Sequence, residues 1–238
     1  MATVAIYSAK GGVGKTTLAV NLAWASARLS SRRTLLWDLD AQAASTFLLS
    51  AGKAKADAQS AFTRDIAPAK LIRPTAIERL DLIGADASLR GLDVLFHELD
   101  KKKRLQKLLT TLAGDYDRVI LDCPPGLTET SEQVIRAADL IVVPVIPSPL
   151  SQRAFDEMAA HLGPKGRVLP VHTMVDRRRK LHAEALAARP DWPVIPMSSM
   201  IEQMAARRAP IGAFAPRSAP ATAFAQLWQA VEKRLAAR

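Results

Sequence analysis

The sequence has 238 residues, of which 49% are hydrophobic and 24% charged, an ordinary balance for a globular chain that can bury a full core. No stretch approaches the roughly 18 uninterrupted apolar residues of a membrane span, and Met1 leads directly into a strand-like segment. We therefore expect neither a membrane helix nor a signal peptide. The single cysteine, Cys123, excludes an internal disulfide framework and a metal site built from several thiolates of one chain. Together these features favour one domain over residues 1–238, located in the cytoplasm.

The formal net charge is +10, and the basic residues are concentrated in the last third of the chain. Residues 161–238 contain 13 Lys and Arg against 5 Asp and Glu, whereas residues 61–160 contain 13 against 15. A basic excess at one end of a chain indicates attraction to a polyanion, such as DNA or an anionic membrane surface. The alternative is that the charge serves solubility alone.

Short apolar runs alternate with amphipathic stretches, which is typical of βα units around a parallel sheet. We predict an α/β fold in which a mostly parallel central sheet is flanked by helices. The predicted strands are residues 3–8, 33–38, 80–84, 117–122, 140–145, 167–173 and 192–196. The predicted helices between them include residues 16–29, 104–112, 131–137, 150–161 and 181–189.

Three other segments are less regular or differ in character. Residues 50–79 show no clean period and are predicted to be a loop or a weak helical excursion. Residues 208–220 contain three prolines and are predicted to be a loop. The last segment carries an apolar helical face, which suits a terminal helix docked on the sheet better than a helix at a membrane surface. The residues of this face are Phe224, Leu227, Trp228, Val231 and Leu235.

A glycine-rich segment, Lys10-Gly11-Gly12-Val13-Gly14-Lys15-Thr16-Thr17, lies between the first predicted strand and the first predicted helix. The standard phosphate-binding pattern G-x-x-x-x-G-K-[ST] requires Gly at position 9, where this chain has Ala9. The glycines still allow successive N–H groups to face a phosphate, and the helix start near Lys15 adds its positive end. Lys15 is expected at the β- and γ-phosphates, Thr16 on Mg²⁺ and Thr17 near the α-phosphate. The segment predicts a site for ATP and Mg²⁺, with a chance glycine-rich turn as the alternative.

Acidic residues end two further predicted strands. Asp38 and Asp40 end the second strand, and Asp122 ends the fourth, before a Cys-Pro-Pro-Gly turn. The carboxyl ends of parallel strands meet at the edge where open α/β sheets build their sites. Carboxylates at this edge can hold the water shell of Mg²⁺ and orient an attacking water. As alternatives, Asp38 could cap a helix and Asp122 could simply end a strand.

These motifs resemble those of the ParA/MinD superfamily of deviant Walker A ATPases, and within it the ParA-type partition ATPases. Residues 10–17 match the family's K-G-G-x-G-K-T-T throughout, residues 38–42 are similar to D-x-D-P-Q, and residues 117–125 are similar to D-Y-V-L-I-D-C-P-P. Similarity continues at residues 173–178 and 208–218 and is weakest over residues 45–79. Two segments depart from the pattern. Ala41 and Ala43 replace a Pro and a Gly, and residues 148–151 replace an acidic-aromatic stretch.

The resemblance implies a role for each matched residue. Lys10 is similar to the signature lysine that contacts the partner's phosphates in a nucleotide-sandwich dimer. Asp40 is similar to the residue that positions the hydrolytic water, and Asp38 and Asp122 to the acids of the Mg²⁺ shell. Catalysis is therefore assigned to Lys10, Lys15 and Asp40. The implied protein is a weak ATPase that dimerises with ATP, binds DNA without sequence preference, and is stimulated by a ParB-like or other adaptor.

The candidate DNA contacts are cations of the basic third that lie in predicted loops or helix starts. They are Arg177, Arg178, Arg179, Lys180, Arg207, Arg208 and Arg217. No base-reading motif is visible, so we expect phosphate-dominated, salt-dependent binding. Residues 101–104 are also basic, but their acidic neighbours favour a solvated helix face.

The expected function is ATP-dependent positioning of a plasmid, a chromosome region or a protein cluster by a cytoplasmic, nucleoid-associated protein. The alternative is a membrane-cycling ATPase of MinD type, which would need a terminal anchor that we do not expect. Iron–sulfur relatives need bridging cysteines, typically two per subunit, and the single Cys123 argues against them.

Overall fold

The computed structural model describes residues 1–50, 56–63, 66–98, 103–160, 162 and 167–237. Within them an eight-stranded sheet has the order β3-β4-β2-β5-β1-β6-β7-β8. Neighbouring strands pair in parallel except β3, which is antiparallel to β4. The strands are β1 (Ala2–Ile6), β2 (Thr34–Asp38), β3 (Ile72–Pro74), β4 (Leu80–Ile83), β5 (Arg118–Asp122), β6 (Leu140–Val145), β7 (Val168–Val175) and β8 (Val194–Pro196). The predicted α/β fold with a mostly parallel sheet is confirmed.

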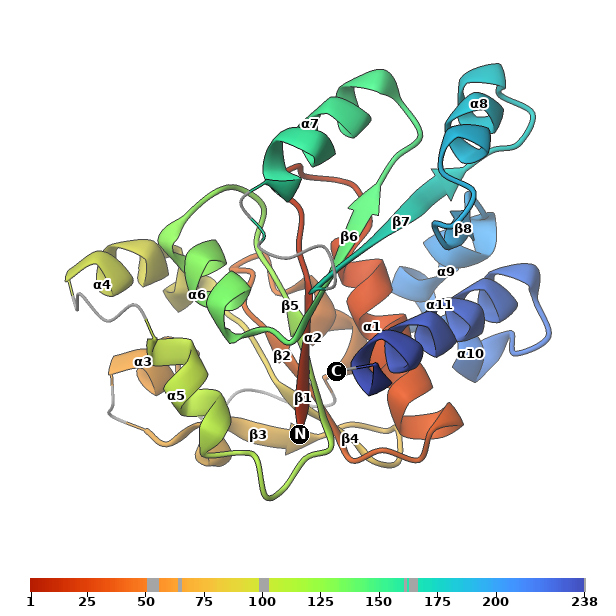
Figure 1. Ribbon diagram of the computed structural model, residues 1–238. Coiled ribbons are helices and arrows are strands. Elements are labelled where there is room, and N and C mark those ends of the chain that lie inside the picture. Colours follow the sequence, from red (N-terminus) through yellow and green to blue (C-terminus); the bar gives the residue numbers. More distant parts are fainter. Residues whose placement is uncertain (51–55, 64–65, 99–102, 161, 163–166, 238) are drawn as a thin grey trace.

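Helices cover both faces of this sheet, as Figure 1 shows. They are α1 (Lys15–Leu29), α2 (Ala44–Leu49), α3 (Ser60–Thr63), α4 (Leu92–Glu98), α5 (Arg104–Thr110), α6 (Glu129–Ala137), α7 (Pro149–Ala159), α8 (Lys180–Ala188), α9 (Ser199–Arg207), α10 (Ile211–Phe214) and α11 (Ala219–Ala236). Short 3₁₀ turns occupy Pro68–Leu71 and Ala87–Gly91.

The core has two halves because side chains of a strand point alternately to opposite faces. Trp37 and Leu121 belong to one apolar cluster with residues of α3 to α7, whereas Leu36 and Ile120 belong to the other with residues of α1, α2 and α9 to α11. Strands buried on both faces read as continuous apolar runs, which is the pattern that predicted them.

The two segments predicted to lack regular structure contain short elements. Residues 50–79 include α3 and the edge strand β3, while residues 51–55 and 64–65 lie outside the described part of the chain. The prediction of a loop over residues 208–220 is wrong in part, because α10 forms one turn there and α11 begins at Ala219. Ser218 caps α11 by accepting a hydrogen bond from the Ala221 N–H, and Pro220 lies in the first turn, where its missing N–H costs nothing. Lys101 and Lys102 of the basic run lie outside the described residues.

The terminal helix α11 is docked, as predicted. Phe224, Leu227, Trp228 and Val231 are at most 3% exposed in the cluster shared with α1. The Trp228 indole donates to Ser30 Oγ at 2.8 Å, at the end of α1. Across the described residues, we find no helix with the length and apolar character needed to cross a bilayer.

The sheet places the predicted motifs at one edge. Strand β5 lies between β2 and β1, and the three run in parallel, so their carboxyl ends meet. In this register Asp122 is paired with Asp38 on one side and with Ile6, the end of β1, on the other. The glycine-rich loop that follows β1 therefore begins beside both acids.

Candidate functional site

The glycine-rich loop turns sharply before α1. Gly12 and Gly14 have φ values of 71° and 94°, in the left-handed region that residues with a Cβ rarely adopt. Gly14 is the N-cap residue, so the helix begins at Lys15 and its first N–H groups lack intrahelical partners. Thr173 Oγ1 of β7 donates to the Val13 carbonyl at 3.0 Å and ties the loop to the sheet. This geometry suits a bound phosphate.

Lys15 is held inside this loop. Its side chain is buried, and Nζ donates to the carbonyl of Lys10 at 3.1 Å. Burial lowers the pKa of Lys15, whereas the nearby charges of Asp122 and Asp40 raise it. An ammonium in this position can neutralise phosphate charge at a place already lined by N–H groups.

Asp38 and Asp122 form a buried pair behind the loop. They are 0% and 1% exposed. Burial raises the pKa of Asp38 to about 7, with the charge of Asp122 adding to the effect, and burial raises the pKa of Asp122 to about 6. The Thr46 N–H and hydroxyl donate to Asp38 Oδ2 at 2.9 and 2.7 Å, and the Ser45 hydroxyl donates to Asp122 Oδ2 at 2.6 Å.

The remaining oxygen of Asp122 provides a test of whether Mg²⁺ fits this site. Oδ1 is buried without a hydrogen-bond partner among the described residues, which is a costly state for a carboxylate oxygen. The Thr16 hydroxyl is close enough to lower the pKa of Asp122 but does not reach hydrogen-bond geometry with Oδ1. A hydrated Mg²⁺ beside Thr16 would satisfy this oxygen.

The donor set also agrees with the way proteins usually hold this ion. Mg²⁺ tends to keep several waters and to be bound by one or two carboxylates together with substrate phosphates. Across the described part of the chain, no group of three or more His, Cys, Asp or Glu could hold a metal without such help. The residues fit a phosphate-bound Mg²⁺ rather than a cage made by protein alone.

Asp40 lies in the turn between β2 and α2. It is half-buried, and its Oδ1 accepts a hydrogen bond from the Gln42 N–H at 2.9 Å. The turn ends at Ala43, whose φ of 54° lies in the left-handed region. This is the position at which the resembled family pattern has Gly, so the departure noted in the sequence places strain at the start of α2.

The turn after Asp122 is bonded to the glycine-rich loop. Gly126 has a φ of 101°, and its N–H donates to the Ala9 carbonyl at 3.0 Å. The Tyr7 hydroxyl donates to the Gly126 carbonyl at 3.1 Å. The sequence predicts a turn here but gives no sign of these two contacts, which tie the turn to β1 and the glycine-rich loop.

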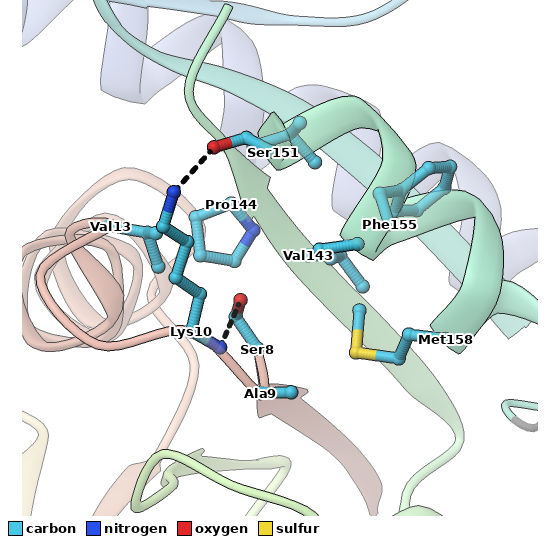
Figure 2. Close-up of a pocket in the computed structure, with 11 residues that line it drawn as sticks. Ser8, Ala9, Lys10, Val13, Val143, Pro144, Ser151, Phe155 and Met158 are labelled. Carbon is cyan, nitrogen blue, oxygen red and sulfur yellow. Dashed lines mark hydrogen bonds between the residues drawn. The ribbon is translucent and has the colours of Figure 1, made fainter. Parts of the chain in front are cut away.

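Lys10 is exposed and reaches α7 of its own chain. Figure 2 shows its Nζ directed at Ser151, whose Oγ accepts a hydrogen bond at 3.1 Å. The backbone N–H of Lys10 donates to Ser8 Oγ at 3.3 Å. Ser151 lies in the segment that replaces the family's acidic-aromatic stretch, so a hydroxyl is the partner that this chain offers to Lys10.

Sequence reasoning missed a pocket beside the start of α1. It has a volume of about 150 Å³ and adjoins Gly14 and Thr17. Its other lining residues include Thr173, Met174, Pro196, Met197 and Ile201. An apolar pocket next to the phosphate loop suits the flat base of a nucleotide. These residues meet only because β7 pairs with β8, and the one signal in the sequence was the family-like segment at residues 173–178.

The candidate DNA contacts fall into two groups rather than one. Residues 177–180 precede or begin α8, whereas Arg207, Arg208 and Arg217 surround α10, and Figure 1 shows α8 and α10 well apart. All seven are exposed. The charge of Arg178 is offset by Asp176, which accepts from its Nε and Nη2 at 2.9 Å.

The fold and the site together define a class. A glycine-rich loop between β1 and α1, with Lys15 and Thr16 at the helix start and an acid at the end of the adjacent strand, is the arrangement of P-loop nucleoside-triphosphate-binding proteins.

Comparisons with known proteins name the family. The profile of a family described as an AAA domain matches residues 1–163. The chromosome partitioning protein ParA of Myxococcus xanthus is 37% identical over 145 residues, which cover 60% of this chain and 51% of that protein. The sporulation initiation inhibitor protein Soj of Bacillus subtilis is 36% identical over 147 residues, which cover 60% of this chain and 57% of that protein. The match thus spans little more than half the length of these relatives.

A solved structure extends the likeness over the whole fold. The septum site-determining protein MinD of Pyrococcus horikoshii, complexed with Mg-ADP, has a TM-score of 0.80 at 22% identity, covering 98% of this chain and 96% of that chain. The chain belongs to the ParA/MinD superfamily of P-loop ATPases.

Proposed function

We propose that residues 1–238 form a single ATPase domain that positions or segregates a cargo in an ATP-dependent manner, as ParA-type proteins do. Binding of ATP and Mg²⁺ promotes a homodimer, and the dimer binds DNA without sequence preference. A ParB-like or other adaptor stimulates hydrolysis to ADP and phosphate, which releases the protein. The location that follows is cytoplasmic and nucleoid-associated.

One observation carries this proposal. Lys15, the Thr16 hydroxyl and the unpaired Asp122 Oδ1 converge at the carboxyl end of β5, beside a loop shaped for phosphate. The name of one relative, a chromosome partitioning protein, supports a positioning role over other ATPase functions.

Each site residue has a role in this proposal. Backbone N–H groups of residues 11–14 and the Lys15 ammonium bind phosphate oxygens, and the Thr17 hydroxyl lies at the α-phosphate. Thr16 ligates Mg²⁺, with Asp38 and Asp122 oriented toward its waters. When bound, Mg²⁺ offsets the negative charge that develops on the phosphates in the transition state. Asp40 orients the attacking water from the exposed side of the acid pair.

Lys10 supplies a second cation to the proposed site. Its ammonium leaves Ser151 and contacts the phosphates of the partner subunit when two ATP-bound chains meet at the edge that carries the loop. Because the side chain is exposed and its hydrogen bond is to a neutral hydroxyl, this exchange costs little.

The membrane-cycling alternative has less support. Among the described helices, α11 is the amphipathic terminal helix considered for this role, and its apolar face is buried against the sheet and α1. A docked helix of this kind would have to leave the core before it could bind lipid, at the cost of exposing Trp228 and Phe224.

The proposal is tested by measuring dimer formation and DNA binding with and without a slowly hydrolysed ATP analogue and Mg²⁺. We expect both to require the nucleotide in the unmodified protein. Lys15→Ala should lose nucleotide binding and with it both responses, whereas Asp40→Ala should bind ATP, hydrolyse it slowly and remain dimeric. DNA binding that is indifferent to nucleotide contradicts the proposal. ATP-dependent binding to anionic vesicles but not to DNA favours the membrane-cycling alternative.

A further inference from the structure

Helix α2 connects the buried acid pair, Asp38 and Asp122, to a turn on the surface that follows α9. This basic turn consists of residues 208–211. At its beginning, Ser45 donates to Asp122 Oδ2, and Thr46 donates twice to Asp38 Oδ2. These bonds fix one oxygen of each carboxylate and leave Asp122 Oδ1 unpaired among the described residues. The position of α2 therefore determines which carboxylate oxygen is presented to a cation.

At the other end, α2 is held by Arg208. Its Nε donates to the Phe47 carbonyl at 2.9 Å, and its Nη2 donates to the Ser50 carbonyl at 2.6 Å. The guanidinium also lies 5.1 Å from the centre of the Phe47 ring. The last carbonyls of a helix lack intrahelical partners and carry partial negative charge, so a forked cation at this place stabilises α2.

The basic turn that contains Arg208 is also attached to α1. The Ile211 N–H donates to Asn21 Oδ1 at 2.9 Å, and Asn21 Nδ2 donates to the Thr17 carbonyl at 2.8 Å. Asn21 is 1% exposed, so these bonds are made in a setting where an unpaired polar group is costly. Residues 208–211 thus rest on α1, which carries Thr16, and on α2, which holds the acid pair.

Arg208 retains donors for an anion. Among the described residues its Nη1 has no hydrogen-bond partner, and the side chain is exposed. The preceding residue, Arg207, carries a second exposed guanidinium, which lies 5.0 Å from the centre of the Phe214 ring. A phosphate bound at Nη1 would hold the planar guanidinium in its present orientation, because the edge formed by Nε and Nη2 stays bonded to α2.

We propose that Arg208 is a positioning residue that couples the Mg²⁺ site to a polyanion-binding turn through α2. By fixing α2 it keeps Asp38 and Asp122 oriented for the water shell of the ion, and a phosphate on the turn stabilises the same arrangement. By linkage, Mg²⁺ with nucleotide and the polyanion each strengthen the binding of the other. This inference rests on the proposed function. It adds to that function an effect of Arg208 on Mg²⁺ binding, which a residue that only contacts DNA phosphates would not have.

The decisive measurement is the Mg²⁺ dependence of nucleotide binding by the full chain in the absence of DNA. Arg208→Ala should raise the Mg²⁺ concentration for half-maximal binding of an ATP analogue roughly five-fold, at the lower end of typical coupling between two sites. Nucleotide affinity in EDTA should not change, since the loop contacts do not involve α2. Thermal unfolding verifies that each variant is folded.

Two further variants separate coupling from charge. Arg207→Ala removes the same charge one residue away, and the contacts described for Arg207 are to Gln203 and Phe214, not to α2, so its Mg²⁺ dependence should match the unmodified protein. Arg208→Lys keeps the charge but lacks the forked geometry. It should therefore keep the Mg²⁺ defect, while at saturating Mg²⁺ and nucleotide it still binds duplex DNA at low salt.

The outcomes are distinct. Equal Mg²⁺ dependence in Arg208→Ala, Arg207→Ala and the unmodified protein overturns the inference, as does full rescue by Arg208→Lys. A Mg²⁺ defect with no effect of duplex DNA on Mg²⁺ affinity in the unmodified protein overturns the polyanion half of the coupling. If the unmodified protein binds no nucleotide, or binds nucleotide but no DNA, the proposed function fails instead.

Discussion

Ala43 combines a side chain and a backbone angle that do not suit each other. Its φ of 54° is one that Gly adopts freely, whereas for a residue with a Cβ the left-handed region costs roughly 1–2 kcal/mol. Gly also gains freedom in the unfolded chain, which offsets part of the difference. We expect Ala43→Gly to raise the free energy of unfolding by about 0.5 kcal/mol. Denaturant titration measures this free energy of unfolding. Ala41 is the control: its φ is not positive, so Ala41→Gly relieves no strain and should lower the free energy of unfolding.

Asp38 and Asp122 give the metal-free protein a pH dependence of definite sign. Both pKa values lie above the ordinary 3.8, at about 7 and about 6, so the folded protein holds these protons more tightly than the unfolded chain. Their contribution to stability is fully present below pH 3.8 and is lost as the pH rises through about 6 to 7. In EDTA, the Asp38→Asn variant should lose less stability than the unmodified protein over this range.

The same pair predicts that binding of Mg²⁺ and nucleotide releases protons. A cation beside the acids favours their charged forms and so lowers their pKa values. Titration calorimetry in two buffers of different ionisation enthalpy counts the protons. We expect release near pH 6.5, diminishing toward about pH 8 as the acids are already ionised. No release near pH 6.5 would show that the ion binds away from the pair, and nucleotide binding in EDTA serves as the control.

The long elements could be predicted from sequence because each has a physical signature over many residues. The strands β1, β2, β5 and β6 are apolar runs buried on both faces, and α1 and α11 span several turns. Their order also placed Asp38 and Asp122 at one edge, and the observed register confirms it. The position of the acids was therefore within reach of sequence alone.

The short elements could not be predicted, because they are too short to show a pattern in the sequence. Strand β3 has three residues, α10 has four and α2 has six, fewer than the periods that reveal a face. Helix α2 also begins without a side-chain cap, so no Ser, Thr, Asp or Asn marks its start. Its start is bonded to Asp38, which is near in sequence, and to Asp122, and its end is bonded to Arg208; Asp122 and Arg208 are distant in sequence. The connection between the acid pair and the basic turn could not be predicted, because it depends on contacts between residues far apart in the sequence.

The packing of α10 on α1 gives a test at the level of elements. A Cβ added at Gly212 would lie 2.2 Å from the ring of Trp24, which is too close for any real contact. Gly212→Ala must therefore move the indole or the helix, and overpacking of this kind costs about 1–3 kcal/mol. Gly114→Ala is the matched control, since nothing lies within 4 Å of its added Cβ. Thermal unfolding of the two variants compares them, and equal stability would show that α10 moves away freely.

At the scale of the whole molecule, net charge indicated a polyanion but could not place it. The seven candidate cations share one third of the sequence, yet the fold separates them into the group at α8 and the group around α10. Sequence reasoning also could not see that Asp176 offsets Arg178 or that Arg208 is engaged on α2. If the chain binds DNA as proposed, these contacts favour the group around α10 over the group at α8, since it combines exposed cations with a link to the proposed nucleotide site.

Salt dependence can decide between the two groups. Each phosphate that the protein binds releases counterions, so the slope of log affinity against log salt becomes shallower by about one for each phosphate that a variant no longer binds. Charge reversal at Arg207 and Arg217 should therefore weaken nucleotide-dependent binding to duplex DNA and flatten the slope by about two. The control is reversal at Arg136 and Arg153, which changes net charge equally but lies on α6 and α7. A similar decrease of affinity in the control would mean that net charge, not a local contact, determines DNA affinity.

The opposite outcome is a normal salt slope after reversal at Arg207 and Arg217, together with a flattened slope after reversal at Arg177 and Arg179. That result would place the DNA at α8, and the coupling proposed through Arg208 would then have no polyanion ligand.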